Sequence, residues 1–168
     1  MIKRADSFLF AVFILFALVV TSCTQQRSPC YEPKIVSVAI GTYRMSDTVA
    51  VDSVLENPDF FCLDTPLSQL IVAGNKFTAL LSPFVDSTRW RLIPDLLTDS
   101  TDGTPIEMYD TITFYHTKQL NFISNACGYA YYFTLDGVKT TYNSIDSIVI
   151  INNSVDNNAS TQHVKIFY

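Results

Sequence analysis

Apolar residues recur at every second position along much of the chain after residue 34, and this alternation most constrains the fold. It is found in residues 35–43, 77–84, 88–94, 109–117, 129–135, 147–151 and 163–168. A strand with one buried and one wetter face gives this period of two, because successive side chains point to opposite sides. The stretches are rich in Val, Ile, Thr, Tyr and Phe, which suit a half-buried pleated surface.

Turn-forming residues separate these stretches, and no run of ten or more residues has a helical stripe. The turn signals include Ser46-Asp47, Asn57-Pro58-Asp59, Gly74-Asn75, Asp136-Gly137 and residues 99–105 and 152–160. Residues 95–100 are compatible with one helical turn. We expect eight or nine short strands in an all-β, antiparallel β-sandwich of immunoglobulin-like architecture, with a closed eight-stranded barrel as the alternative.

The first residues have the composition of an export signal. Lys3 and Arg4 precede thirteen consecutive apolar residues, Phe8 to Val20. This run is shorter than the roughly 20 residues that a membrane-spanning helix needs, so it fits a cleaved signal better.

The end of this run, Val20-Thr21-Ser22-Cys23, resembles the lipobox of bacterial lipoprotein precursors. The resemblance implies a signal peptide over residues 1–22, cleavage after Ser22 and lipidation of Cys23. Several acyl chains on one residue anchor a protein stably, whereas a single chain binds only marginally. An ordinary secretory signal and a short uncleaved anchor are the alternatives.

The remaining chain is long enough for one domain, which we expect over residues 34–168 after a tether over residues 23–33. The tether sequence is polar and contains Pro29 and Pro33. The net charge of the chain is −5, and after residue 22 the densest basic stretch is Arg89-Trp90-Arg91. A nucleic-acid partner is not expected, because such proteins carry a cationic footprint that replaces the counterions of phosphate.

Cys30, Cys62 and Cys127 remain after Cys23 is assigned to lipid. In an oxidising compartment three thiols form at most one intramolecular disulfide and leave one over. They include no C-x-x-C pair, and His116 and His163 are the only histidines, so we predict no metal site and no cofactor.

No arrangement of residues indicates catalysis. His116 shares a strand face with Ile112 and Phe114, which favours a packing role for its ring. For Cys127, a disulfide or a buried thiol is favoured over a catalytic nucleophile. A solvated loop is favoured over a glycosidase pair or a calcium site for five acidic residues: Asp95, Asp99, Asp102, Glu107 and Asp110. Core packing is favoured over a sugar- or peptide-binding platform for seven aromatic residues: Trp90, Tyr109, Tyr115, Tyr129, Tyr131, Tyr132 and Phe133.

Several short motifs resemble a family of uncharacterised Bacteroidota lipoproteins that is grouped as a domain of unknown function. The matching residues are Cys30, Leu81-Ser82-Pro83-Phe84, Asp110 to Tyr115, Ser124 to Gly128 and His163 to Phe167. Ser82 departs from the family's Leu-Pro-Leu-like segment, and Cys62 has no counterpart. The resemblance implies a disulfide between Cys30 and Cys127 and brings no established activity.

Location is inferred by analogy with other lipoproteins. Thr24 to Ser28 contains no acidic residue, unlike the acidic run of some surface-displayed lipoproteins, and Thr24 is not an inner-membrane retention Asp. We therefore expect an outer-membrane lipoprotein that faces the periplasm. A non-enzymatic module that binds an envelope protein or component is the leading hypothesis, and an envelope hydrolase acting on glycan or peptide is the alternative.

Overall fold

The computed structural model describes residues 29–32, 34–56, 58–64, 74–94, 97–98, 105–106, 108–158 and 160–168. In these ranges the chain forms twelve strands and no helix. The strands are β1 (Ser37–Ser46), β2 (Val49–Asp52), β3 (Asp59–Cys62), β4 (Lys76–Leu80), β5 (Ser87–Ile93), β6 (Leu97–Thr98), β7 (Pro105–Ile106), β8 (Asp110–Ser124), β9 (Gly128–Lys139), β10 (Ser147–Ile150), β11 (Ser154–Val155) and β12 (Val164–Phe167).

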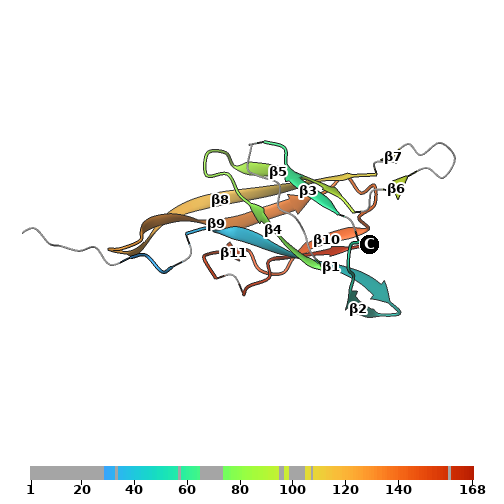
Figure 1. Ribbon diagram of the computed structural model, residues 1–168, viewed down its shortest axis with the longest axis horizontal. Coiled ribbons are helices and arrows are strands. Elements are labelled where there is room, and N and C mark those ends of the chain that lie inside the picture. Colours follow the sequence, from blue (N-terminus) through green and yellow to red (C-terminus); the bar gives the residue numbers. More distant parts are fainter. Residues whose placement is uncertain are drawn as a thin grey trace, which may run out of the picture.

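Ten of these strands form two five-stranded sheets (Figure 1). One sheet has the order β10-β12-β1-β2, with β4 also paired to β1, and the other has the order β11-β9-β8-β5-β3. The short strands β6 and β7 pair with each other. The predicted all-β sandwich is confirmed, and the described strands remain in separate sheets and do not close into the alternative barrel.

One pairing differs from the antiparallel prediction. β1 pairs in parallel with β12, with Ile40 opposite Val164 and Tyr43 opposite Phe167. Parallel neighbours need a long connection, and nearly the whole domain lies between these two strands. Alternation in the sequence indicates which face of a strand is buried. It is the same whether the neighbouring strand runs parallel or antiparallel, so it could not predict this pairing.

The core lies between the two sheets and contains most of the side chains that the alternation placed inward. Val38 and Ile40 from β1 pack in one cluster with Trp90 and Leu92 from β5. Phe60 of β3 contacts rings on both sides, because it stacks on Trp90 at 4.5 Å and meets Phe77 of β4 at 4.7 Å between ring centroids. Burial of each large apolar side chain contributes about 2 kcal/mol.

Trp90 also links the two sheets through a hydrogen bond. Its indole Nε1 donates to the carbonyl of Leu80, at 3.1 Å, in the opposite sheet. The side chain is fully buried, so this bond satisfies a polar group that would otherwise lose its contact with water.

Three local predictions are wrong. Asp136 and Gly137 do not form a turn but lie inside β9, where Asp136 is the extra residue of a bulge opposite Tyr115 and His116. A bulge uses the same residue types as a turn, which explains the error. Leu97 and Thr98 are in a strand and not in a helical turn, and the predicted strand at 77–84 ends at Leu80.

The hairpin of β8 and β9 extends past the rest of the sandwich and gives the molecule its elongated shape (Figure 1). Its turn lies at one end, beside the first described residues of the chain, whereas β2 and the C-terminus lie toward the other end. The turn contains Asn125 to Cys127, and Gly128 has a φ of 74°, a conformation that favours glycine.

Candidate binding surface

His116 is a core residue of β8. Its Nε2 lies 2.9 Å from the hydroxyl of Thr88, and its ring meets Phe133 edge-on at 5.3 Å between centroids. The Thr88 hydroxyl also accepts a hydrogen bond from the backbone N–H of Ser82. Burial lowers the pKa of His116 and keeps the ring neutral. The predicted packing role is therefore the one observed.

His163 holds the edge of β12 against β1. Its Nδ1 accepts a hydrogen bond from the backbone N–H of Ala39 at 3.0 Å, so the ring proton must lie on Nε2. That nitrogen is buried and has no hydrogen-bond partner among the described residues. Burial lowers the pKa of His163 as well. Both histidines are thus neutral structural groups, and within the described ranges neither lies next to an accessible nucleophile.

Two of the cysteines form a disulfide. Cys30 is bonded to Cys127, the pairing that the family resemblance implied. The thiol of Cys127 is therefore not available as a nucleophile in this structure. Cys62 lies half-buried on β3, outside the disulfide. Cys23 and Ser22 lie outside the described residues, so lipidation and cleavage stay predictions.

The acidic stretch contributes one described residue, and it is not in a solvated loop. Asp110, the first residue of β8, is fully buried. Its carboxylate accepts hydrogen bonds from the backbone N–H groups of Asn143, Ser144 and Ile145 and from two hydroxyl groups. The hydroxyl donors are Thr141 and Ser144, at 2.8 and 2.6 Å.

This network decides the ionisation of Asp110. Burial by itself raises the pKa of the carboxyl, but the hydrogen bonds from Ser144, Asn143 and Thr141 together outweigh it, so the pKa lies below its ordinary value. The prediction of a solvated acid is wrong for Asp110, because five donors replace its water. Asp95, Asp99, Asp102 and Glu107 lie outside the described residues.

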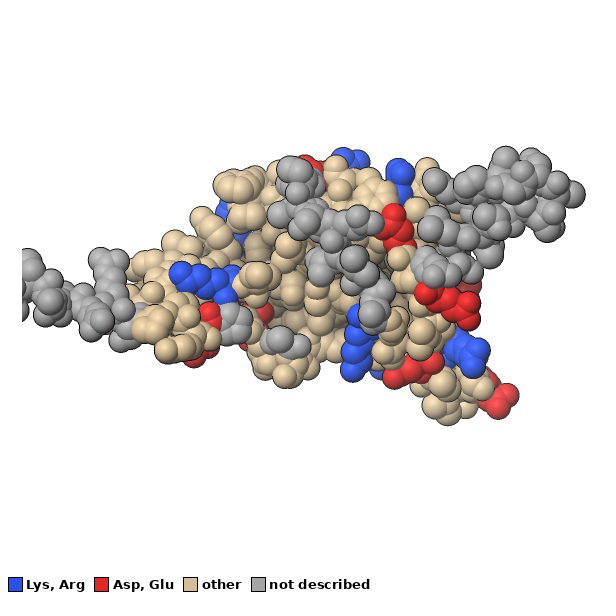
Figure 2. Space-filling model, in the orientation of Figure 1, with Lys and Arg blue, Asp and Glu red and all other residues tan. Residues whose placement is uncertain are grey.

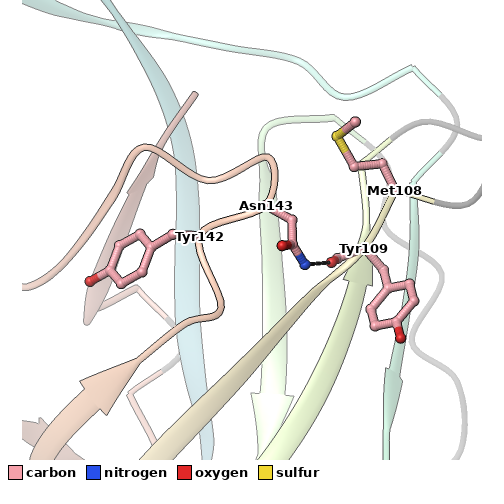
Figure 3. Close-up of a pocket in the computed structure, with 4 residues that line it drawn as sticks. All are labelled: Met108, Tyr109, Tyr142 and Asn143. Carbon is pink, nitrogen blue, oxygen red and sulfur yellow. Dashed lines mark hydrogen bonds between the residues drawn. The ribbon is translucent and has the colours of Figure 1, made fainter.

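An open hollow of about 490 Å³ lies beside this network (Figure 3). Met108 and Tyr109 precede β8, and Tyr142 and Asn143 belong to the loop between β9 and β10. Asn143 Nδ2 donates to the carbonyl of Tyr109 at 2.6 Å, and the Tyr142 ring points away from this pair in the close-up. Arg91 packs over the Tyr109 ring at 4.2 Å. The described residues that line the hollow are one methionine, two tyrosines and one asparagine, which suit binding through apolar contact and hydrogen bonds.

The seven aromatic residues are divided between core and surface. Trp90 and Phe133 are buried, as predicted, and Tyr132 is half-buried. Tyr109, Tyr115, Tyr129 and Tyr131 are exposed, which contradicts the core assignment for these four. Tyr129 and Tyr131 share a strand side with buried Phe133 and Leu135, but the hairpin carries them past the end of the opposite sheet.

The exposed part of the hairpin has a continuous apolar face. Leu120 lies opposite Tyr131, and Phe122 lies opposite Tyr129, with the rings of the latter pair 5.3 Å apart. We call these four residues the hairpin face; their exposed fractions are between 42% and 63%. The predicted strand ended at residue 117, and Leu120 and Phe122 were not assigned. Continued alternation through residue 122 is the signal that could have identified them.

A second apolar hollow, of about 280 Å³, lies at the same end of the sandwich. Ile35 precedes β1, and Leu81 to Phe84 follow β4, whose last residue pairs with Ser37 at the start of β1. The Lys118 ammonium donates to the carbonyl of Pro83, which holds this loop against β8. Ile35 and Phe84 are strongly exposed, so the exposed apolar residues at this end extend beyond the hairpin face.

Charged side chains of both signs are intermixed on the visible face of the molecule, and several of each sign gather near β2 (Figure 2). No basic footprint of the kind that binds nucleic acid is present on this face. Within the described ranges, no cluster of three or more His, Cys, Asp or Glu side chains has the arrangement of a metal site. None of the described segments is a helix able to cross a membrane.

A family model for a family of unknown function, DUF6452, matches residues 52–168. The chain belongs to this family. Comparison with curated proteins and with solved structures gave no significant match.

The matched region of this DUF6452 protein includes the whole β8–β9 hairpin and the buried Asp110 network, but not β1 or Cys30. Four of the five motifs that carried the resemblance lie inside it. They are located at the apolar end loop, at the start of β8, in the hairpin turn and at β12. Their roles in the fold are structural. Leu81 and Ser82 are buried, and Asp110 accepts the hydrogen bonds of the loop after β9. Cys127 forms the disulfide in the hairpin turn, and His163 accepts a hydrogen bond from the backbone of β1.

Proposed function

We propose that this DUF6452 protein is a bacterial lipoprotein whose β-sandwich is a non-enzymatic binding or structural module of the cell envelope. In this proposal the signal peptide is cut after Ser22, and Cys23 carries the lipid anchor. The domain belongs to the outer membrane and faces the periplasm, in a member of the Bacteroidota. Its partner is an envelope protein or component, and nucleic acid is not a partner.

The Cys30–Cys127 disulfide is the observation that carries the proposal. Structural disulfides persist in oxidising compartments and are rare in the cytosol, so the bond agrees with export. The export-type sequence over residues 1–23 gives the same compartment by separate reasoning.

The state of the reactive side chains supports a non-enzymatic role. His116 and His163 are buried and neutral, and Asp110 is fully engaged by five hydrogen-bond donors. Cys127 is in the disulfide. These are the described residues that sequence reasoning considered for nucleophile, base or acid, and all of them support the fold instead.

Exposed aromatic and aliphatic residues support a binding role. Large exposed apolar surfaces on a folded domain mark interaction sites, because water penalises them. The hairpin face, the apolar end hollow and the hollow beside Tyr109 are three surfaces with exposed apolar residues in the described part of the chain.

The test is the intact mass of the protein purified from the membrane fraction of cells. The expected mature chain begins at Cys23 and carries acyl mass. The Cys23→Ala variant is expected to be absent from the membrane fraction. Cys62→Ser is the matched control, which keeps both the acyl mass and the membrane attachment. A chain that starts elsewhere or lacks acyl mass would contradict the lipoprotein assignment.

The binding role is tested in the same cells by crosslinking and affinity capture from the membrane fraction. Wild-type protein is expected to recover a specific envelope partner, and unrelated lipoproteins captured in parallel are the control. Recovery of the same set of proteins by both baits would contradict the binding role. Turnover of a glycan or peptide substrate by the purified protein would contradict the non-enzymatic assignment.

A further inference from the structure

We infer that the hairpin face, formed by Leu120, Phe122, Tyr129 and Tyr131, rests on the lipid bilayer beside the anchor. The bilayer is the occupant of this apolar surface, and the sandwich stands on the membrane by its hairpin end. The inference rests on the proposed lipidation of Cys23.

The hairpin face continues a core-forming side of β8. Ile112, Phe114 and His116 occupy alternate positions of this strand and are buried. Leu120 and Phe122 follow in the same alternation and are exposed, because the hairpin has passed the end of the opposite sheet. Beyond the core, no described segment outside the hairpin packs on these apolar side chains. An exposed apolar surface of this kind is typical of a site that contacts another molecule or a membrane.

The disulfide brings this face to the anchored end of the chain. Cys127 lies in the hairpin turn, next to Gly128 and Tyr129, and is bonded to Cys30. Cys30 is seven positions after Cys23, and a fully extended chain reaches at most about 25 Å over that length. A lipid on Cys23 therefore keeps the hairpin turn close to the bilayer in every conformation of the tether.

The chemistry of the hairpin favours a lipid surface. Residues 119–135 contain no Asp, Glu, Lys or Arg, so contact with headgroups and upper acyl chains desolvates no charge there. Tyrosine combines an apolar ring with a hydroxyl that stays hydrated, and it is enriched at membrane–water interfaces. Phe122 and Leu120 supply the apolar surface beside the two tyrosines.

Apolar and charged side chains are exposed at both ends of the molecule (Figure 2), since the end of β1 and β2 expose Met45, Val49 and Val51. The hairpin end also exposes Ile35 and Phe84. The opposite region carries several charged side chains near β2 (Figure 2). Lys118 borders the hairpin face and donates to the carbonyl of Pro83, so its charge has a partner next to the surface. Contact of the hairpin face with lipid leaves the charged side chains near β2 in water (Figure 2), and the position of the anchor is what selects the hairpin end for this contact.

Site-specific photo-crosslinking in cells tests this orientation. Benzoylphenylalanine is introduced at Tyr129 and, in a second variant, at Phe122 of the full-length protein. After irradiation we expect a phospholipid adduct at either position, detected as added mass on the crosslinked peptide. Benzoylphenylalanine at Tyr142, an exposed residue beyond the other end of β9, is the control and is expected to give no phospholipid adduct.

Each outcome is decisive once an intact disulfide shows, on non-reducing gels, that the variants have folded. Crosslinks from positions 122 and 129 to another protein, or to a second copy of this chain, overturn the inference in favour of that occupant. An acylated protein without a lipid adduct at either position overturns the inference and leaves the proposed function standing. A protein without acyl mass on Cys23 overturns both.

Discussion

Among the described residues, Asp110 is the one whose side chain accepts five hydrogen bonds. It joins the start of β8 to the loop between β9 and β10 through backbone and hydroxyl donors of residues 141–145. A buried carboxylate is unfavourable by itself, and only this complete set of donors makes its ionised form stable. The network therefore fixes the loop that carries Tyr142 and Asn143.

Asp110→Ala is expected to lower the free energy of unfolding by about 3 kcal/mol, because it leaves several buried donors without an acceptor. The measurement is equilibrium unfolding in urea at pH 7. Asp146→Ala changes an exposed acid near the same loop and is expected to alter the free energy by less than about 0.5 kcal/mol. Equal effects of the two substitutions would contradict the role assigned to Asp110.

The pKa of Asp110 gives this contribution a defined pH range. Because the folded pKa lies below the ordinary value, the unfolded chain binds the proton more tightly. The stabilisation from ionised Asp110 is therefore complete above about pH 4 and is lost as the pH falls through the lower folded value.

The burial of His116 and His163 predicts a second pH dependence of the free energy of unfolding, at higher pH than that of Asp110. Burial lowers the pKa of both rings, so between that lowered value and the ordinary value of about 6.5 the unfolded chain binds more protons. Stability is expected to be constant above about pH 7.5 and to decrease as the pH falls below 6.5. Urea midpoints at pH 7.5 and pH 5.5 measure the effect.

His163→Asn is the informative variant for this dependence. Its amide oxygen offers an acceptor for the Ala39 N–H but has no proton to gain in this range. The decrease in stability between pH 7.5 and pH 5.5 is expected to be smaller than in the wild type. An unchanged decrease would mean that His163 does not contribute to the pH dependence.

At the scale of elements, the disulfide ties the β8–β9 hairpin to Cys30, among the first described residues of the chain. The bond between Cys30 and Cys127 closes a loop with a sequence separation of 97 residues. In the chain-entropy model, a crosslink over this separation stabilises the folded state by up to about 4–5 kcal/mol.

The double substitution Cys30→Ser and Cys127→Ser is expected to lower the free energy of unfolding by up to about 4 kcal/mol, since the unfolded chain regains this loop entropy. Urea unfolding of the purified domain is the measurement. Cys62→Ser, which leaves the disulfide intact, serves as the control and is expected to have a smaller effect. A loss of less than about 1 kcal/mol in the double variant would contradict a stabilising crosslink.

The strands of the core could be predicted because the alternation of apolar residues within each strand indicates which of its side chains are buried. Val38 and Ile40, or Trp90 and Leu92, alternate with less buried neighbours and are all buried. The short strands β2 and β11 could not be predicted, because all four residues of β2 are exposed and β11 has only two residues. Asp136 and Gly137 misled the prediction, since turns and bulges both favour such residues.

The surface of the hairpin could be predicted only in part. The period of two placed Tyr129 and Phe133 on the same side of β9, which is correct. It could not predict that Phe133 is covered by the second sheet and that Tyr129 is not. That difference depends on where the opposite sheet ends, and no local pattern in β9 reports it.

For the whole molecule, the two sheets share one core and are expected to unfold together. Trp90 is the only tryptophan of the chain and lies in the centre of this core, with its hydrogen bond to the opposite sheet. Unfolding in urea followed by tryptophan fluorescence and by far-ultraviolet circular dichroism should therefore give coincident transitions. A fluorescence transition that precedes the loss of strand signal would show that the sheets separate before they unfold.

The orientation of the whole molecule follows from the two inferences together. In the proposed anchored state, a lipid on Cys23 and the disulfide at the hairpin turn place the hairpin end nearest the membrane. In that orientation the hollow beside Tyr109 and Asn143, at the far end of β8, is presented to the envelope space. It is the surface on which a protein partner is expected.

The sequence by itself determined the class of fold, the inward side of the long strands and the predicted export signal, because alternation, turn residues and an apolar run are all local patterns. Only the tertiary structure decided the parallel pairing of β1 with β12, the complete burial of Asp110 and the exposure of the hairpin face. These features depend on which segments lie against one another across many residues, and burial of a side chain is a property of that packing.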